Sequence, residues 1–144
     1  MTVAQMQDAL ADQLADELCG TANPIIPDLQ VDARLNPNPT PPAIDIYPGS
    51  PFTEAIAFGR TSRQYWFTIR ARVSTADNQG GQDLLLSMMD DGSSESVEAA
   101  IISVREYAGA KLGDIEGPTE FGTFRDSVGE ESLLGCTWRV ALIP

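Results

Sequence analysis

The chain has 144 residues, of which 21 are acidic, nine are basic and none is histidine, so its formal net charge at pH 7 is −12. This length predicts one domain, residues 1–144, that buries its own core, and an apolar content of 42% excludes wholesale disorder. The acidic surface disfavours binding to nucleic acid and anionic lipid. The absence of histidine removes imidazole-based catalytic triads and the commonest zinc ligand.

The two cysteines, Cys19 and Cys136, lie far apart and form no CxxC motif. We expect free, partly buried thiols in a reducing compartment, with a single disulfide as the alternative. The N-terminus lacks the basic region and apolar core of a signal peptide. No apolar run approaches the ~20 residues that a membrane-spanning helix needs. We therefore expect a soluble protein that is made in the cytoplasm.

Residues 2–18 are expected to form a helix. Thr2 and Gln5 have the spacing of a capping box, in which each side chain accepts a hydrogen bond from the backbone of the other residue, and Gly20 marks a stop. Apolar residues repeat along one face at helical spacing: Val3, Met6, Leu10, Leu14 and Leu18. We expect this face to pack in the core, and the alternative is a helix that binds a partner.

The next segment is dominated by proline, with eight of the ten prolines between Pro24 and Pro51. Proline lacks a backbone N–H and restricts the residue before it, so residues 36–51 are expected to form a proline-rich loop. Alternating apolar residues at 29–35 and 44–46 predict short strands that flank it as an edge strand or a hairpin. The loop is either a stiff, solvated connection or an arm that docks on a neighbouring subunit.

Residues 65–74 give the clearest strand signal, because apolar and polar residues alternate with a period of two. One face, expected to be buried, carries Tyr65, Phe67, Ile69, Ala71 and Val73. The other face, expected to be solvated, carries Trp66, Thr68, Arg70, Arg72 and Ser74. A shorter strand is expected within residues 53–60.

Two helices are expected to follow this strand. Ser74 and Asp77 can form a capping box, apolar residues at 84–89 have helical spacing, and Gly92 is expected to end the helix in the left-handed conformation. A serine at 93 or 94 can cap a second helix over residues 94–107, which should stop near Gly109.

Residues 112–130 are rich in glycine and acidic residues and are expected to form an acidic, glycine-rich loop with some strand. The carboxylates suggest a Ca²⁺ site, but their spacing does not match an EF-hand loop, so we expect no metal. Residues 134–142 alternate again and should pair antiparallel to the 65–74 strand. The predicted fold is α+β: a mainly antiparallel sheet, with the N-terminal helix and two consecutive helices packed largely on one face.

Four of the eight arginines fall within thirteen residues: Arg60, Arg63, Arg70 and Arg72. In so acidic a chain, they either pair with carboxylates of the same chain on a solvated sheet face or contact an acidic surface of another subunit. If they form a subunit interface, charge reversal at Arg60 or Arg72 should disrupt assembly without unfolding the subunit.

We find no motif typical of catalysis or of nucleotide binding. The acidic pairs at 90–91 and 130–131 are better explained as solvated turns than as catalytic carboxylates, which require a pocket that tunes their pKa. We therefore expect no enzymatic activity, no cofactor and no metal, and a small acidic enzyme remains the remote alternative.

The second half of the chain resembles the tail terminator, or tail completion, proteins of long-tailed bacteriophages. The resemblance covers residues 60–144 and follows pattern more than identity. Its features are a strand ending in Arg72-Val73-Ser74, the sequence Thr-Ala-Asp at 75–77, a helix with Gln82, Leu85 and Met89, the Asp-Asp-Gly turn at 90–92, a second helix with Ser96-Val97 and Ala100-Ile101, and the closing strand 134–143.

This resemblance implies a structural virion protein that forms a ring, usually a hexamer, on the head-proximal end of the tail tube. Such a ring stops growth of the tube and joins the tail to the head connector, so its partners are copies of itself, the tail tube protein and a connector or neck protein. Genomic DNA would pass through the lumen without specific binding. Another neck or tail-tube component is the alternative.

Overall fold

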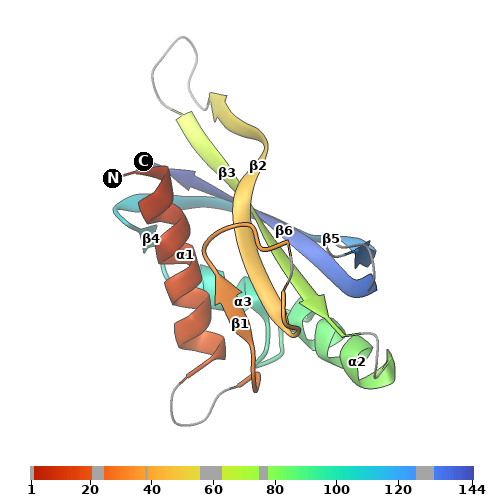
Figure 1. Cartoon of the computed structure of the whole chain (residues 1–144). Coiled ribbons are helices and arrows are strands. Elements are labelled where there is room, and N and C mark those ends of the chain that lie inside the picture. The colour runs from red at the N-terminus through yellow and green to blue at the C-terminus, as the bar shows by residue number, and fades with distance from the viewer. Residues whose placement is uncertain (1, 21–24, 38, 56–62, 75–77, 126–131) are drawn as a thin grey trace.

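The computed structural model describes residues 2–20, 25–37, 39–55, 63–74, 78–125 and 132–144. Its helices and strands, labelled in Figure 1, are α1 Val3–Leu18, β1 Gln30–Asp32, β2 Ala43–Ala55, β3 Arg63–Val73, α2 Asn78–Met89, α3 Val97–Ile102, β4 Glu106–Tyr107, β5 Ala110–Arg125 and β6 Ser132–Ile143. The strands form one sheet in the order β1-β2-β3-β6-β5-β4. Among the described strands, only β1 and β2 are parallel, which confirms the predicted α+β fold with a mainly antiparallel sheet.

The centre of the sheet is the pairing of β3 with β6. Nine residue pairs run without a break from Tyr65 opposite Leu142 to Val73 opposite Leu134, as the alternating patterns predict. The same register places Ile69 opposite Trp138, and both side chains are fully buried. Alternation then directs every second side chain of both strands toward one side of the sheet.

The three helices cover that side. Thr2 and Gln5 form the predicted capping box, with hydrogen bonds of 2.8 and 3.1 Å between them. The predicted α1 stripe is confirmed as core: Met6, Leu10, Leu14 and Leu18 are each at most 2% exposed. They share one apolar cluster with β3 and β6 and with residues of α2 and α3: Leu85, Met88, Val97, Ala100 and Ile101. Burying each large apolar side chain contributes about 1.5–3 kcal/mol.

The second predicted helix is shorter than expected at both ends. It begins at Val97 after the N-cap Ser96, although the sequence predicts Ser93 or Ser94 as the cap, and it ends at Ile102. Residues 106–107 form β4 instead, and Tyr107 and Ala110 face each other across a two-residue turn. Ala108 and Gly109 both have positive φ, of 52° and 86°, which is the geometry of a tight hairpin. Gly109 therefore ends a strand and not a helix.

The helix predicted before this one ends at Met89, two residues before the predicted end at 91, and it ends by a different mechanism. Gly92 does not adopt a left-handed conformation. Instead, the Asp90 side chain accepts a hydrogen bond of 2.9 Å from the Gly92 N–H, so a carboxylate closes the turn. The proposed cap residue Asp77 lies outside the described residues.

The proline-rich segment is shorter as a loop than predicted. β1 pairs with β2 in parallel, so it is an edge strand but not one arm of a hairpin. β2 continues through Pro48 and Pro51 to Ala55, and its register with β3 breaks between Pro48 and Thr53. Prolines are tolerated there because a register break needs no ladder N–H. The rest of the predicted 53–60 strand lies outside the described residues.

Residues 112–125 also differ from the prediction, because they belong to β5 and not to a loop. Three register shifts interrupt the pairing of β5 with β6. Positive φ values of 114° at Gly117 and 57° at Glu120 accompany these shifts, so glycine and polar residues suit a bulged strand here. The remainder of the predicted loop, 126–131, lies outside the described residues.

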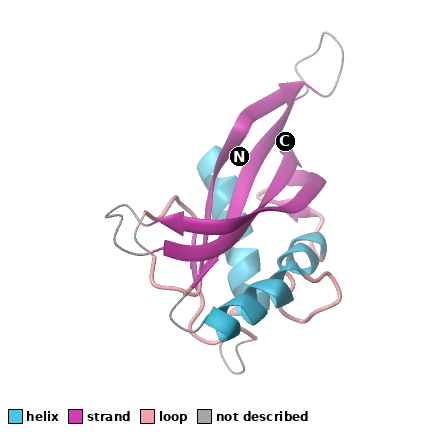
Figure 2. Ribbon diagram, turned by 90° about the vertical axis from the view of Figure 1, so that its right-hand side faces the viewer, coloured by secondary structure: helices cyan, strands magenta, loops and turns pink. Residues whose placement is uncertain are grey.

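The β2–β3 ribbon extends beyond the helices at one end of the molecule, as the two views in Figures 1 and 2 show.

Cys19 and Cys136 are both free thiols, as predicted, and Cys136 is fully buried. None of the helices in the described part of the chain is both long and apolar enough to cross a membrane.

Gly81 in α2 provides a test of this packing. A Cβ at position 81 would overlap the carbonyl oxygen of Ser74. Alanine normally stabilises a helix interior by about 1 kcal/mol relative to glycine, but we expect Gly81→Ala to destabilise the protein by about 1–3 kcal/mol because of this overlap. Chemical denaturation measures the change. Gly122→Ala is the control, since nothing lies within 4 Å of its added Cβ. A stabilised Gly81→Ala protein would contradict the close approach of α2 to Ser74.

Candidate functional site

The side of the sheet opposite the helices carries polar and charged residues in matched rows. Asp45, Arg70 and Thr137 lie side by side on β2, β3 and β6, and Tyr47, Thr68 and Arg139 form the next row. We call this side the outer sheet face; it also includes Trp66 and Arg72 of β3 and Glu116, Thr119 and Glu120 of β5. The sequence predicts it to be solvated, yet Arg72 and Thr137 are only 1–2% exposed.

A buried ion cluster lies at its centre. The Asp45 carboxylate is 1% exposed and binds the Arg70 guanidinium through two bonds, Nε–Oδ1 at 3.1 Å and Nη2–Oδ2 at 2.7 Å. Arg72 Nη2 lies 3.3 Å from the same Oδ2. The two-pronged geometry offsets part of the desolvation cost of these charges. Burial lowers the pKa of Arg72, and the neighbouring Asp45 opposes that effect.

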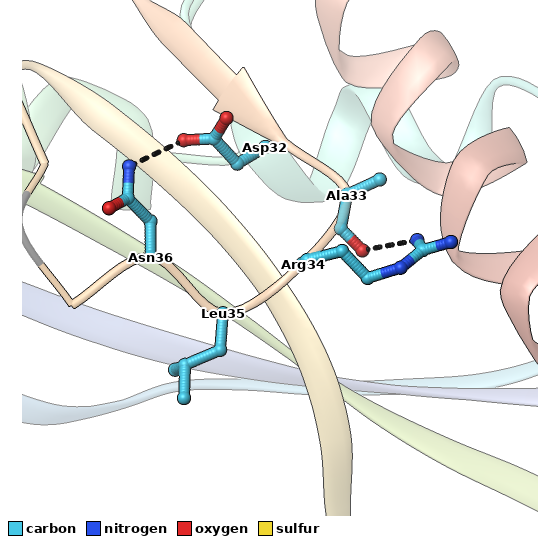
Figure 3. A pocket seen from close by; sticks show the side chains of 5 residues that line it. All are labelled: Asp32, Ala33, Arg34, Leu35 and Asn36. Atoms are coloured by element: carbon cyan, nitrogen blue, oxygen red, sulfur yellow. Dashed lines mark hydrogen bonds between the residues drawn. The ribbon is translucent and has the colours of Figure 1, made fainter.

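The same cluster holds the connection between β1 and β2. The Asn36 N–H donates to Asp45 Oδ2 at 3.0 Å, and the Asn36 carbonyl accepts from Arg72 Nη2 at 2.7 Å. The Asn36 side chain donates to Asp32 Oδ2 at 2.8 Å, as Figure 3 shows. This part of the proline-rich segment is therefore docked on its own sheet. Whether other parts contact a neighbouring subunit stays a prediction.

An open hollow of about 220 Å³ lies beside residues 32–36 (Figure 3). Arg34 donates to the Ala33 carbonyl and pairs with Asp8 at 3.0 Å, while Leu35 is 57% exposed. This hollow is lined by five consecutive residues of one segment, so it lacks the converging polar groups of a ligand site.

The four arginines predicted as a subunit interface differ in their surroundings. Arg70 and Arg72 pair with Asp45 of their own chain, as one of the two interpretations expects, although the pairs are buried and not solvated. Arg63 is exposed at the start of β3, and Arg60 lies outside the described residues. Charge reversal at Arg72 is therefore expected to destabilise the subunit, which changes the expectation from the sequence. The interface role of all four stays a prediction.

Trp66 and Arg139 form a contact that the sequence does not indicate. The Arg139 guanidinium carbon lies 4.1 Å from the centre of the Trp66 ring, within cation–π range. Arg139 also pairs with Glu116 at 3.1 Å, and Trp66 Nε1 donates to Glu54 Oε2 at 2.8 Å. As a result Trp66 is only 4% exposed. Only the register of β3 with β6 and β5 could have revealed this arrangement.

A shallow pocket of about 230 Å³ opens beside this contact. It is lined by Tyr47, Pro48, Ser50, Thr68, Thr119, Glu120, Thr137 and Arg139. These side chains supply hydroxyls and one charge of each sign, so they can form hydrogen bonds with a partner surface. Burial raises the pKa of the Tyr47 hydroxyl, which keeps it protonated and able to donate. Within the described part of the chain, no three metal-ligating His, Cys, Asp or Glu side chains gather.

No family model matches the chain, and no curated protein matches its sequence.

The ion cluster predicts that replacing Asp45 lowers the stability of the protein much more than replacing the exposed Asp8. Asp45→Asn leaves two arginines without their buried counter-charge and should destabilise the protein by about 3–5 kcal/mol. Asp8→Asn removes the exposed pair with Arg34 and should cost about 0–1 kcal/mol. Urea denaturation of both variants at pH 7 measures the difference. Equal, small effects would show that Asp45 does not stabilise the outer sheet face.

Proposed function

We propose that this protein is a structural virion protein, a tail terminator, that forms a ring on the head-proximal end of a phage tail tube. The ring stops growth of the tube and joins the tail to the head connector. The proposal starts from the resemblance of residues 60–144. In the fold, the strand, the two helices and the closing strand of that resemblance are β3, α2, α3 and β6, which pack around one core.

The observation that carries the proposal is the outer sheet face. Asp45 and Arg72 are buried, and Asp45 holds Arg70 in place. The charges that a partner can reach are those of Glu116 and Arg139, which fix each other, and of Glu120. No helix among the described elements packs its apolar side on this face. A fixed pattern of charges and hydroxyls is suited to recognising another protein surface, because electrostatic complementarity sets orientation and specificity. Among its described residues, this face has no activated nucleophile, so we propose a role in assembly and not in catalysis.

A ring requires two different surfaces of one subunit that fit each other, repeated around an axis until the contacts close. In this chain, the exposed Arg63 near the β2–β3 end and the carboxylates of β5 can supply opposite charges to such a contact. The overall charge of −12 also suits a lumen through which DNA slides, because like charges reduce adhesion. In this proposal the protein is assembled in the host cytoplasm and resides at the head–tail junction.

Charge reversal at Arg63 tests the proposed assembly. We expect the native chain to elute as a ring, six copies in the simplest case, in size-exclusion chromatography with light scattering. Arg63→Glu should shift the equilibrium toward the monomer without changing the thermal midpoint, because its side chain is exposed. Arg105→Glu is the matched control, since it makes the same charge change at another exposed position.

A native chain that stays monomeric, alone and with tail tube protein, would contradict the ring. Electron micrographs of particles that lack the protein separate the remaining alternatives. Overlong tails indicate a missing terminator, whereas filled heads without tails indicate a missing connector.

A further inference from the structure

We infer that neighbouring copies of this chain join edge to edge, with β5 of one copy pairing with β2 of the next. This inference rests on the proposed ring and names the surfaces that form it. β1 pairs only with residues 43–45 of β2, and β4 pairs only with residues 110–111 of β5. Within the described part of the chain, residues 47–55 and 112–125 therefore have a strand neighbour on one side only. Such edges carry backbone groups that can bind another strand. On β5 the Leu112 N–H already donates to the Arg105 carbonyl and the Ile115 N–H to Asp114 Oδ1, so the other residues of this stretch supply the pairing.

The covered part of β2 ends at a defined point. The Gln7 side-chain amide donates to the Ile46 carbonyl at 3.1 Å and to the Ala33 carbonyl at 2.8 Å. Strand β1 thus covers the β2 edge at residues 43–45 and Gln7 of α1 covers it at Ile46, so the edge is open from Tyr47 onward. The open stretch lies on the ribbon that extends beyond the helices in Figures 1 and 2, so the helices do not block access to it.

The directions of the two edge strands suit them to pair with each other. The strands β2, β3, β6 and β5 alternate in direction, so β2 and β5 run in opposite senses. Rotation about a ring axis preserves the direction of each strand along that axis. β5 of one copy therefore meets β2 of the next as an antiparallel pair, and the alternation continues from copy to copy. The two edges differ, so the contact is head to tail, as a closed ring requires.

The charges near the edges are complementary. Asp114 and Glu120 lie on β5 and form no ion pair with other described residues. Arg63 lies on β3, one strand inward from the open edge of β2, and is also outside the ion pairs of the described chain. Strands in a sheet are about 4.8 Å apart, so edge pairing places Arg63 two strand spacings, about 10 Å, from the β5 strand that carries these carboxylates, a separation at which opposite charges still attract.

Both edges are also irregular, which limits what they can bind. Pro48 and Pro51 interrupt β2, and Pro118 with three register shifts interrupts β5. Prolines and bulges discourage pairing with arbitrary strands. Only short stretches remain able to pair, so the match between one copy and the next is specific and each contact is small.

Disulfide trapping tests the edge contact. Ser50→Cys or Thr53→Cys places a thiol on the exposed part of β2, and Asp114→Cys or Thr123→Cys places one on β5. Burial raises the pKa of the native Cys136 to about 12 and also raises the pKa of Cys19, so both native thiols stay in place with little reactivity at pH 8. The four double variants that combine one residue from each edge are oxidised mildly and analysed by non-reducing electrophoresis. The four single variants are the controls.

At least one double variant should give a ladder of covalent species that ends at the size of the ring, while the single variants stay monomeric. Rings in light scattering without a ladder from any double variant would overturn edge pairing and leave the proposed function intact. Covalent dimers from a single variant would show that like edges meet, which also overturns it. A chain that forms neither rings nor ladders, with or without tube protein, would overturn both proposals.

Discussion

The unbroken ladder between β3 and β6 is the constraint on which the rest of the structure depends. Because its nine pairs keep one register, apolar side chains of both strands point to one side of the sheet and charged side chains to the other. This alternation gives the helices a core to pack against and brings Arg70 and Arg139 onto one face with Asp45. A slip of one residue would exchange the two sides and bury the charges against the helices.

The distribution of charge follows from that arrangement. Of the eight arginines, Arg70, Arg72 and Arg139 are used within the outer sheet face, where each has a carboxylate of the same chain. These cations neutralise only Asp45 and Glu116. Most acidic residues in the described part of the chain therefore form no ion pair, and they set the sign of the surface field. A strongly negative exterior and an ordered internal ion cluster thus coexist in one small domain.

Patterns among neighbouring residues predict most of the fold, but they do not predict which strands pair when the strands are distant in sequence. The capping box of α1 and the alternation of β3 and β6 depend on neighbouring residues, so the sequence reveals them. The parallel pairing of β1 with β2 and the docking of Asn36 on the ion cluster join residues that are distant in sequence, so no local pattern contains them. β5 looks like a loop because it is rich in glycine and acid, and its strand state comes from pairing with β6. Likewise, the sequence singles out Arg70 and Arg72 but not Asp45 or the Trp66–Arg139 contact, which register creates.

One side chain links three parts of the molecule that are distant in sequence. The buried amide of Gln7 joins helix α1 to the carbonyls of Ala33 and Ile46. The first helix is therefore more than a cover for the core, because its position determines how far the backbone of β2 is occupied. Loss of the Gln7 contacts would free the Ile46 carbonyl and lengthen the available edge of β2 by one residue, up to the point where β1 begins to pair.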